Sequence, residues 1–178
     1  MSVNKILSFV ADYIVQKPIL IQQHVDKSSF FDRSWNEFKV GFGNPRGNFW
    51  LGNEQIHQLT KDGGCKLRFL VQQEVSSSWF KAEYSTFIVA DETSNYQLTV
   101  AGFSGDVNYD AFSPHNGGSF GTHNRDVADY AVYYRGGFWF INGVGANARV
   151  NAADHLFDWH NLAGGDDLMY CQMWLECP

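Results

Sequence analysis

Histidine and cysteine are the residue types in this chain that are best suited to acid–base, nucleophilic or metal chemistry. The six histidines are His24, His57, His115, His123, His155 and His160. They form no H-E-x-x-H or other close ligand spacing, and the sequence contains no C-x-x-C motif and no phosphate-binding loop. We therefore interpret the chain as a binding protein and not as an enzyme.

The three cysteines are Cys65, Cys171 and Cys177. Cys171 and Cys177 are six residues apart on a predicted strand, which places them roughly 20 Å apart, too far to bridge each other. A pairing of Cys65 with either of them stays open. We expect that disulfides are not what holds this fold.

Composition and charge limit the classes of partner. The 178 residues include 13 Lys and Arg against 19 Asp and Glu, a formal net charge of −6. No basic patch is visible, so nucleic acid and anionic membranes are not expected partners. No apolar run is long enough to span a membrane, and residues 1–20 make a poor signal peptide, which leaves the compartment open.

Aromatic residues make up 16% of the chain, from 15 Phe, 8 Tyr and 6 Trp. Large rings concentrate buried area, and Tyr and Trp add a polar group that suits ligand contact. The length fits one domain, which we predict over 1–178. We divide it into an N-terminal helix over 1–18, a sheet-rich core over 19–101 and a loop-rich recognition region over 102–178.

Hydrophobic spacing predicts the elements. Ile6, Phe9, Val10, Tyr13 and Ile14 follow helical spacing, and Pro18 ends the pattern. Further short helices are predicted over 35–40 and 54–59, and strands over 66–71, 79–89, 96–100 and 169–175. The stretch 102–137 shows little periodicity and is expected to carry function. The predicted class is α+β, with a central antiparallel sheet, short helices and a loop-rich C-terminal subdomain.

Three motifs occur in order along the chain. The first runs W-N-E-F-K-V-G-F-G-N over 35–44 and continues as G-N-F-W-L-G-N-E-Q-I-H over 47–57. The second combines D-A-F at 110–112, H-N-G at 115–117 and F-G-T at 120–122, and the third is G-G-F-W-F over 136–140. Together they resemble the fibrinogen-related (fibrinogen C-terminal) domain family. His57 and His115 fall inside these motifs, and we interpret them as hydrogen-bonded structural residues.

The resemblance implies a secreted recognition protein, often one that binds acetylated sugars beside a calcium ion. The calcium loop corresponds to 120–128 here. Asp126 keeps one side-chain ligand of that loop, whereas Ala128 replaces another. Calcium takes six to eight oxygen ligands. We therefore predict no tight calcium site, no other cofactor, and a vestigial role for Asp126.

Other departures from the family pattern concern cysteines. The resemblance implies a disulfide between the positions of Tyr130 and Gly143, where neither residue is cysteine. We expect aromatic packing to offset its loss, which costs about 2–5 kcal/mol in small secreted domains. The resemblance also implies a cis peptide before Tyr130, whose retention the sequence leaves open. The family's disulfide-linked opening subdomain is replaced by the predicted helix over 1–18, which either packs on the sheet or mediates self-association.

By the same resemblance, the wall of the ligand pocket is formed by Tyr130, Ala131, Tyr134 and Phe140. The predicted function is lectin-like binding of acetylated or other small glycan groups, with a glycan or glycoprotein as partner. The alternative is a protein-interaction or self-association module, including a homo-oligomer, whose sugar site has decayed. The resemblance implies an extracellular location, while the missing family disulfides leave an intracellular one open. We expect Trp139→Ala to unfold the domain and Tyr134→Ala to leave it folded with altered binding.

Overall fold

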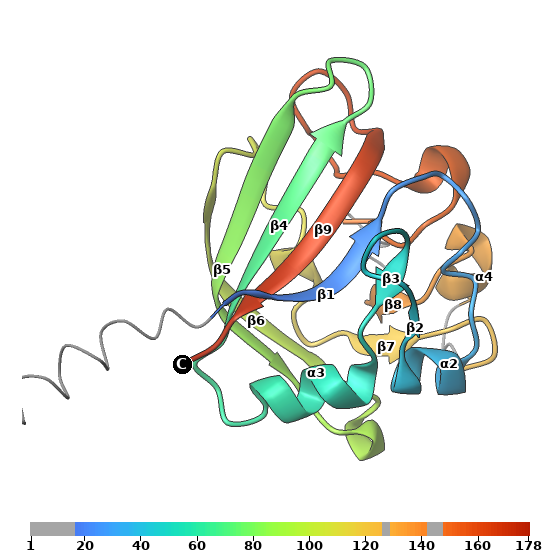
Figure 1. The fold of residues 1–178 in the computed structure, drawn as a ribbon, viewed down its shortest axis with the longest axis vertical. Coiled ribbons are helices and arrows are strands. Elements are labelled where there is room, and N and C mark those ends of the chain that lie inside the picture. Colours follow the sequence, from blue (N-terminus) through green and yellow to red (C-terminus); the bar gives the residue numbers. More distant parts are fainter. Residues whose placement is uncertain (1–16, 126–128, 142–147) are drawn as a thin grey trace, which may run out of the picture.

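The computed structural model describes residues 17–125, 129–141 and 148–178. Their main feature is a seven-stranded antiparallel sheet in the order β2-β3-β1-β9-β4-β5-β6 (Figure 1). Its strands are β1 (Ile19–His24), β2 (Phe42–Gly43), β3 (Phe49–Trp50), β4 (Lys66–Gln73), β5 (Trp79–Val89), β6 (Leu98–Gly105) and β9 (Leu168–Glu176). A second sheet pairs β7 (Ser119–Gly121) with β8 (Phe138–Phe140).

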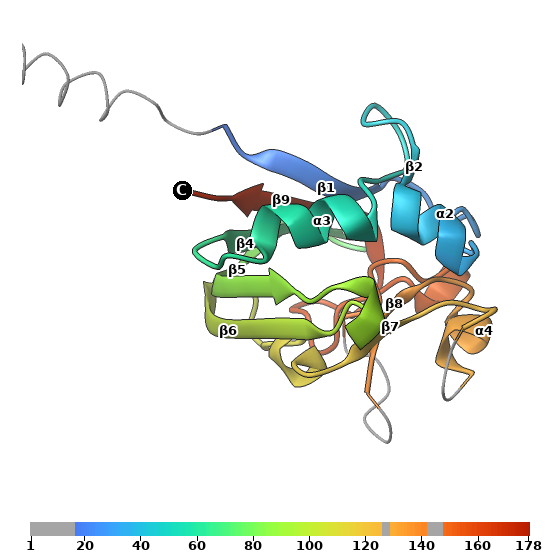
Figure 2. The ribbon, with the colours of Figure 1, turned by 90° about the horizontal axis from the view of Figure 1, so that it is seen from below.

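The described helices are short. They are α2 (Trp35–Val40), α3 (Asn53–Thr60) and α4 (Tyr130–Tyr134), with 3-10 turns η1 (Glu92–Ser94), η2 (Ser113–His115) and η3 (Asp154–Leu156). None of these helices has the length and apolar character that a membrane span needs. The chain after β6 is mostly loop and carries the small β7–β8 sheet and α4 to one side of the large sheet (Figures 1 and 2).

The last strand of the chain lies in the middle of the large sheet. β9 pairs antiparallel with β1 on one side and with β4 on the other. In β4 the side chains of Leu67, Phe69 and Val71 are buried while the intervening residues are not. One face of the sheet therefore packs on the core, and the other face, called the outer face below, points to solvent.

Helix α2 shows how the sequence sets local geometry. Ser34 caps its N-terminus in a capping box with Glu37. The helix ends at Gly41, whose φ of 92° is the left-handed region that glycine tolerates. A Cβ at Gly41 would lie 2.3 Å from the carbonyl oxygen of Leu51, so a side chain cannot be accommodated there.

The aromatic core joins the large sheet to the C-terminal region. Trp139 is fully buried, with its ring centroid 6.0 Å from that of Trp50, 5.9 Å from that of Phe87 and 5.2 Å from that of Phe120. Its indole nitrogen donates to the carbonyl oxygen of Tyr96 at 2.8 Å. A single side chain thus links β3, β5, β7 and β8.

The predicted elements agree with the structure where the sequence patterns are long. The helix over 35–40 and the strand over 79–89 have the predicted bounds, and α3, β4 and β9 extend their predictions by one or two residues. The strand predicted over 96–100 is instead 98–105. β1, β2, β3, β7, β8 and α4 were not predicted. The expected irregular stretch over 102–137 contains the end of β6, all of β7 and all of α4. The helix predicted over 1–18 falls outside the described residues except for Lys17 and Pro18, which are not helical.

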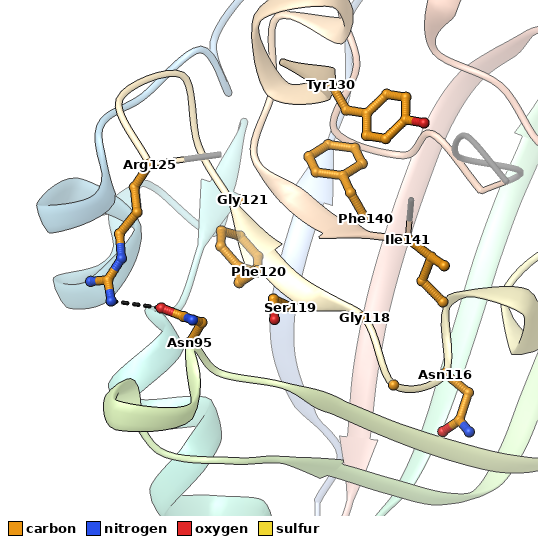
Figure 3. A pocket seen from close by; sticks show the side chains of 11 residues that line it. Asn95, Asn116, Gly118, Ser119, Phe120, Gly121, Arg125, Tyr130, Phe140 and Ile141 are labelled. Carbon is orange, nitrogen blue, oxygen red and sulfur yellow. Dashed lines mark hydrogen bonds between the residues drawn. The ribbon is translucent and has the colours of Figure 1, made fainter. Parts of the chain in front are cut away.

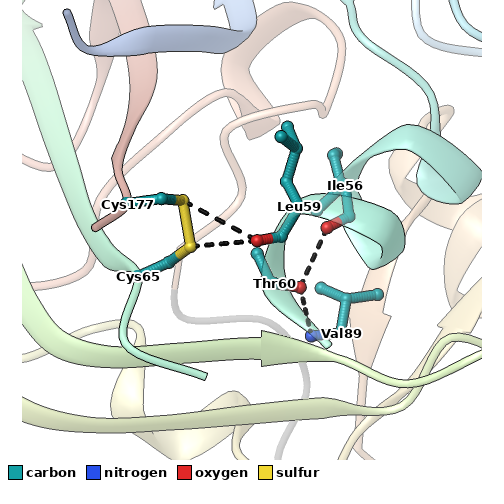
Figure 4. Close-up of a disulfide and its surroundings, with 6 residues drawn as sticks. All are labelled: Ile56, Leu59, Thr60, Cys65, Val89 and Cys177. Carbon is teal, nitrogen blue, oxygen red and sulfur yellow. Dashed lines mark hydrogen bonds between the residues drawn. A yellow bond between two sulfur atoms is a disulfide. The ribbon is translucent and has the colours of Figure 1, made fainter. Parts of the chain in front are cut away.

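The expectation about disulfides is wrong. Cys65 and Cys177 form a disulfide, while Cys171 is buried and free (Figure 4). The cause is the sheet: Lys66 pairs with Glu176 in the β4–β9 register, which brings the residues just outside that pair together. The bond closes a loop over a sequence separation of 112 residues. The sequence could not show this pairing, because it depends on the last strand returning to the middle of the sheet.

The end of α3 lies beside this disulfide. The hydroxyl of Thr60 donates to the carbonyl oxygen of Ile56 at 2.9 Å and accepts from the backbone N–H of Val89 at 3.0 Å (Figure 4). His57 contributes a further link, since its Nδ1 lies 2.8 Å from the carbonyl oxygen of Val89. The interpretation of His57 as a structural residue agrees with this contact.

Candidate functional site

A groove of about 580 Å³ runs along the outside of β7 (Figure 3). Asn95 and Arg125 lie at one end of it and Asn116 at the other. Phe140 and Ile141, together with Tyr130, form one wall. A hollow with apolar walls and a few converging polar groups is the usual form of a small-ligand site.

Three aromatic rings pack together at the wall of the groove. Tyr130 and Tyr134 are four residues apart on α4 and therefore lie on the same face of the helix. The ring of Tyr134 stacks on that of Phe140 with a centroid distance of 5.9 Å and an interplanar angle of 19°. The ring of Tyr130 lies 5.8 Å from that of Phe140 and 6.3 Å from that of Tyr134. The stacked rings give the groove a wall whose shape is set by packing.

All four residues predicted for the pocket wall lie in this region, but they do not all face the groove. Tyr130 and Phe140 line it. Ala131 is buried, and Tyr134 is only 8% exposed. Tyr134 is therefore a packing residue behind the wall, and the expectation that Tyr134→Ala stays folded with altered binding remains a prediction.

Behind the wall, Tyr134 and Phe140 border a second space. This slot holds only about 10 Å³, about the least that one water molecule needs. The guanidinium of Arg149 lies over the Tyr134 ring at 5.7 Å and is held by Asp158, whose Oδ1 accepts from Arg149 Nε at 2.7 Å. The slot is too small for an acetyl group.

Helix α4 starts and ends at residues with positive φ. Asp129 precedes it with a φ of 56° and Arg135 follows it with a φ of 52°. The peptide bond between Asp129 and Tyr130 is trans, since no described peptide bond is cis. The cis peptide before Tyr130 that the family resemblance implies is therefore not present here. A cis bond before a residue other than proline costs about 2.5–4 kcal/mol.

The Arg125 side chain at one end of the groove is held by several contacts. The Arg125 guanidinium stacks on the Trp35 ring at 3.9 Å and donates through Nη2 to Asn95 Oδ1 at 2.6 Å (Figure 3). Glu92 lies 3.9 Å from Arg125 Nη1. Glu92 also accepts from Lys39 at 2.6 Å and from the Trp35 indole at 2.7 Å, and these hydrogen bonds lower its pKa. The cation is thus held in place with an ionised carboxylate nearby.

The opposite end of the groove carries an oriented amide. The side-chain oxygen of Asn116 accepts from the backbone N–H of Val100 at 2.9 Å. This contact assigns the other end of the amide as the NH₂ group, a hydrogen-bond donor. Neighbouring His115 is fully buried, and its Nδ1 lies 2.6 Å from the carbonyl oxygen of Trp139. Burial lowers the pKa of His115 to about 4, so at neutral pH it is an uncharged structural histidine, as interpreted from the sequence.

The floor of the groove includes a serine in a suggestive sequence context. Ser119 lies within G-G-S-F-G at 117–121, which has the G-x-S-x-G spacing of hydrolase nucleophiles. Those serines occupy a sharp strand-to-helix turn. Ser119 is instead the first residue of β7 and pairs with Phe140 of β8. The local backbone is not that of a nucleophile elbow.

The calcium loop of the family fits poorly here. Asp126, the vestigial ligand, lies outside the described residues, and these contain no group of three His, Cys, Asp or Glu side chains that could hold a metal ion. The side-chain oxygen of Asn124 already accepts from the backbone N–H of Trp35 at 2.9 Å and from the Thr122 hydroxyl at 3.0 Å. Arg125 adds a positive charge to the same loop. The described part of the loop therefore offers few free oxygen ligands to a calcium ion.

Apart from three glycines, six residues that line the groove were missed from the sequence: Asn95, Asn116, Ser119, Phe120, Arg125 and Ile141. Asn95 belongs to a polar turn that was predicted between two strands, and Asn116 to the H-N-G motif, so both segments were recognised without a role for these side chains. Arg125 and Ile141 carry no pattern that would mark them. Their positions depend on how β7 and β8 pack.

Comparisons with known proteins agree with this fold. The family model for the C-terminal globular domain of fibrinogen beta and gamma chains matches residues 16–161. Among curated proteins, the chain is 37% identical to protein scabrous of Drosophila melanogaster over 144 residues, covering 78% of this chain and 18% of that protein. It is 34% identical to human ficolin-3 over 157 residues, covering 82% of this chain and 52% of ficolin-3. The chain thus spans about half or less of the length of these relatives.

Solved structures show the same likeness. The fibrinogen-like globe domain of human ANGPTL2 superposes with a TM-score of 0.79 at 30% identity, covering 89% of this chain and 79% of that one. The corresponding domain of human ANGPTL6 gives a TM-score of 0.80 at 28% identity, with 90% and 78% covered. Both are antiparallel-sheet domains of the kind predicted from the sequence motifs. This chain belongs to the fibrinogen C-terminal domain family.

Proposed function

We propose that the chain is a lectin-like recognition module whose groove binds acetylated or other small glycan groups without calcium. The observation that carries this proposal is the ring wall of Tyr130 and Phe140 beside a groove with an amide near each end. Sugars present apolar C–H faces and a rim of hydroxyl groups. An aromatic wall with polar groups at its edges matches both features.

The polar groups have separate tasks in this proposal. The Asn116 NH₂ group donates to a sugar hydroxyl or to an acetyl carbonyl oxygen, and the guanidinium of Arg125 donates at the other end. Because the slot behind the wall holds only about 10 Å³, an acetyl methyl group lies against the groove side of Phe140. Buried polar atoms of the ligand must be paired for net affinity, and these donors supply the pairs.

Independence from calcium follows from the poor fit of the calcium loop. The side-chain oxygen of Asn124 is already engaged and Arg125 is a cation. Binding is therefore expected to persist in a chelator. The disulfide between Cys65 and Cys177 also supports an oxidising, extracellular setting, as the family resemblance implies.

The test is a glycan-array screen of the purified domain, run in parallel with calcium and with EDTA. The proposal expects binding to acetylated glycans of equal strength in both arms. Binding that EDTA abolishes would overturn the calcium-independent part. An array without signal in both arms would overturn the glycan proposal as a whole.

A protein-interaction module is the second candidate, and one observation favours it. On α4, the side chains of Val132 and Tyr133 are 52% and 65% exposed, next to the groove wall. Exposed apolar groups of this kind are typical of protein contact surfaces. A silent array together with a protein partner whose binding is lost in Tyr133→Ser would establish this function instead.

A further inference from the structure

The outer face of the large sheet carries aromatic and charged side chains that are not part of the core. Three aromatic residues, Trp79, Tyr170 and Trp174, lie on it, and Trp79 is 53% exposed. Five charged residues lie on the same face: Lys66, Arg68, Lys81, Glu83 and Glu176. Figure 1 shows β4, β5 and β9 with no described helix in front of them. Exposed tryptophan beside tyrosine is a common feature of binding surfaces.

A hollow of about 230 Å³ lies at one end of this face, between β4, β5 and β6. The charged residues Lys66, Arg68, Glu83 and Glu176 line it, together with the hydroxyl-bearing residues Ser85 and Ser104. Its wall therefore presents guanidinium donors, carboxylate acceptors and hydroxyl groups that do both.

Glycine keeps one wall of the hollow open. Gly102 has a φ of 75°, and a Cβ built on it would lie 1.9 Å from the hydroxyl oxygen of Ser85. Any other residue at 102 would therefore displace the Ser85 side chain, which lines the hollow.

Ion pairs join four of the charged side chains on the outer face. Arg68 Nε lies 2.8 Å from Glu83 Oε1, and Arg68 Nη2 lies 2.8 Å from Glu176 Oε1. Lys81 Nζ lies 3.0 Å from Glu83 Oε2. The hydrogen bond from Arg68, followed by that from Lys81, lowers the pKa of Glu83, so its carboxylate is ionised at neutral pH. Arg68 and Lys81 balance Glu83 and Glu176, and Lys66 adds one further positive charge to the lining of the hollow.

At the other end of the face, Trp79 and Tyr170 form a corner. Their ring centroids are 5.3 Å apart with an interplanar angle of 66°. The Tyr170 hydroxyl donates to Gln23 Oε1 at 2.7 Å, and Gln172 Nε2 donates to the same oxygen at 2.5 Å. The indole N–H of Trp174 donates to Gln172 Oε1 at 3.1 Å. These hydrogen bonds orient the tyrosine and the second tryptophan across β1 and β9.

The hollow and the aromatic corner belong to one strip of the sheet. Arg68 pairs with Glu83, and Gln72 pairs with Trp79, in the β4–β5 register. Four residues of a strand span about 13 Å, and side chains two residues apart point to the same face. Leu70, midway along β4, is half-buried and connects the two ends with an apolar surface.

We propose that the outer face is a second binding site, which takes a neutral oligosaccharide. One sugar unit occupies the hollow, where Glu83, Glu176 and Arg68 bond its hydroxyl groups. Another unit lies with its C–H face against the corner of Trp79 and Tyr170. The ligand class follows from two features: aromatic rings for stacking on the C–H faces of sugars, and converging hydrogen-bond donors and acceptors for their hydroxyl groups. This site shares no residue with the groove along β7.

The experiment is a titration of the full chain with two unacetylated oligosaccharides, laminarihexaose and cellohexaose, followed by isothermal calorimetry and by NMR of the indole N–H signals. Trp79→Ala tests the aromatic corner and Glu83→Gln tests the hollow. Tyr109→Ala is the matched control, because Tyr109 is an exposed aromatic residue away from the outer face. At least one oligosaccharide is expected to bind and to shift the Trp79 indole signal. Each test variant is expected to weaken that binding about tenfold or more, and the control is expected to leave it unchanged.

Several outcomes would overturn the proposal. They are an absence of binding by both oligosaccharides, or a test variant that binds as tightly as the control. Trp79→Ala could instead change the oligomeric state, measured by sedimentation, without changing saccharide binding. That result would assign the outer face to contact with a second copy of the chain. Binding of N-acetylglucosamine, measured in the wild type and in Tyr130→Ala, reports on the groove alone, so failure of one site is distinguishable from failure of the other.

Discussion

At the scale of single residues, Tyr130 and Tyr134 show how neighbours on one helix differ in role. Tyr130 borders the groove, whereas Tyr134 is buried against Phe140. We expect Tyr130→Ala to remain folded, with a melting temperature within a few degrees of the wild type, and to lose most glycan binding. Tyr134→Ala is expected to lower stability by about 2–4 kcal/mol through lost packing. Thermal unfolding and glycan titration of both variants check this, and a Tyr130→Ala variant with full affinity would contradict the placement of the site.

Two buried histidines predict how stability depends on pH. Burial lowers the pKa of both His24 and His115 to about 4, below the unfolded value of about 6.5. The unfolded chain therefore binds more protons between these values, so stability is complete above about pH 6.5 and falls as the pH drops toward 4. Each histidine accounts for at most roughly 3 kcal/mol of that fall. Asp26, with an oxygen 3.8 Å from His24 Nε2, partly opposes the shift.

The measurement is urea unfolding at pH 7.5 and pH 4.5. The difference between the two pH values is expected to be smaller in His24→Gln than in the wild type, because one buried titrating group has been removed. His155→Gln is the control, since His155 is exposed in the 3-10 turn η3. An equal difference in wild type and His24→Gln would show that His24 does not contribute.

At the scale of elements, the disulfide joins Cys65, the residue before β4, to Cys177, the residue after β9. For a closed loop of this length, the chain-entropy model gives a stabilisation of about 4–5 kcal/mol. We expect Cys65→Ser with Cys177→Ser to lower the free energy of unfolding by up to that amount. Urea unfolding with and without reductant checks this. The wild type should lose stability in reductant while the double variant should not, and a wild type indifferent to reductant would contradict the prediction.

The elements also differ in how far the sequence predicts them. β5 is an eleven-residue strand with the alternation of buried and exposed residues that one-sided sheets produce, and its bounds were predicted correctly. β2, β3, β7 and β8 have two or three residues each. Such strands are too short to show a period, and they exist because partners far along the chain supply their hydrogen bonds. β1 was missed for a related reason: four successive residues, from Ile21 to His24, are buried, so the pattern does not alternate.

At the scale of the whole molecule, Trp139 joins the large sheet to the groove-bearing region. Its side chain contacts rings from three other strands, and its indole N–H donates a hydrogen bond to the carbonyl oxygen of Tyr96. Trp139→Ala is expected to cost about 3–5 kcal/mol, which is a large share of the stability of a domain this size, and to unfold it at ambient temperature. Circular dichroism checks this, with Tyr109→Ala as an exposed control. A folded Trp139→Ala with native stability would contradict the central role of this residue.

The sequence by itself determined the family, the α+β class and the main helices and strands, because these depend on local spacing and on dense motifs that are written in consecutive residues. It also determined that Tyr130 and Phe140 lie at a common site, through their positions in those motifs. Only the tertiary structure decided which rings face the groove, which cysteines pair and which charges meet on the outer face. Those features depend on β9 returning between β1 and β4, and on contacts between residues many tens of positions apart. Local patterns contain no information about such contacts, because the free energy that selects them comes from packing the whole chain.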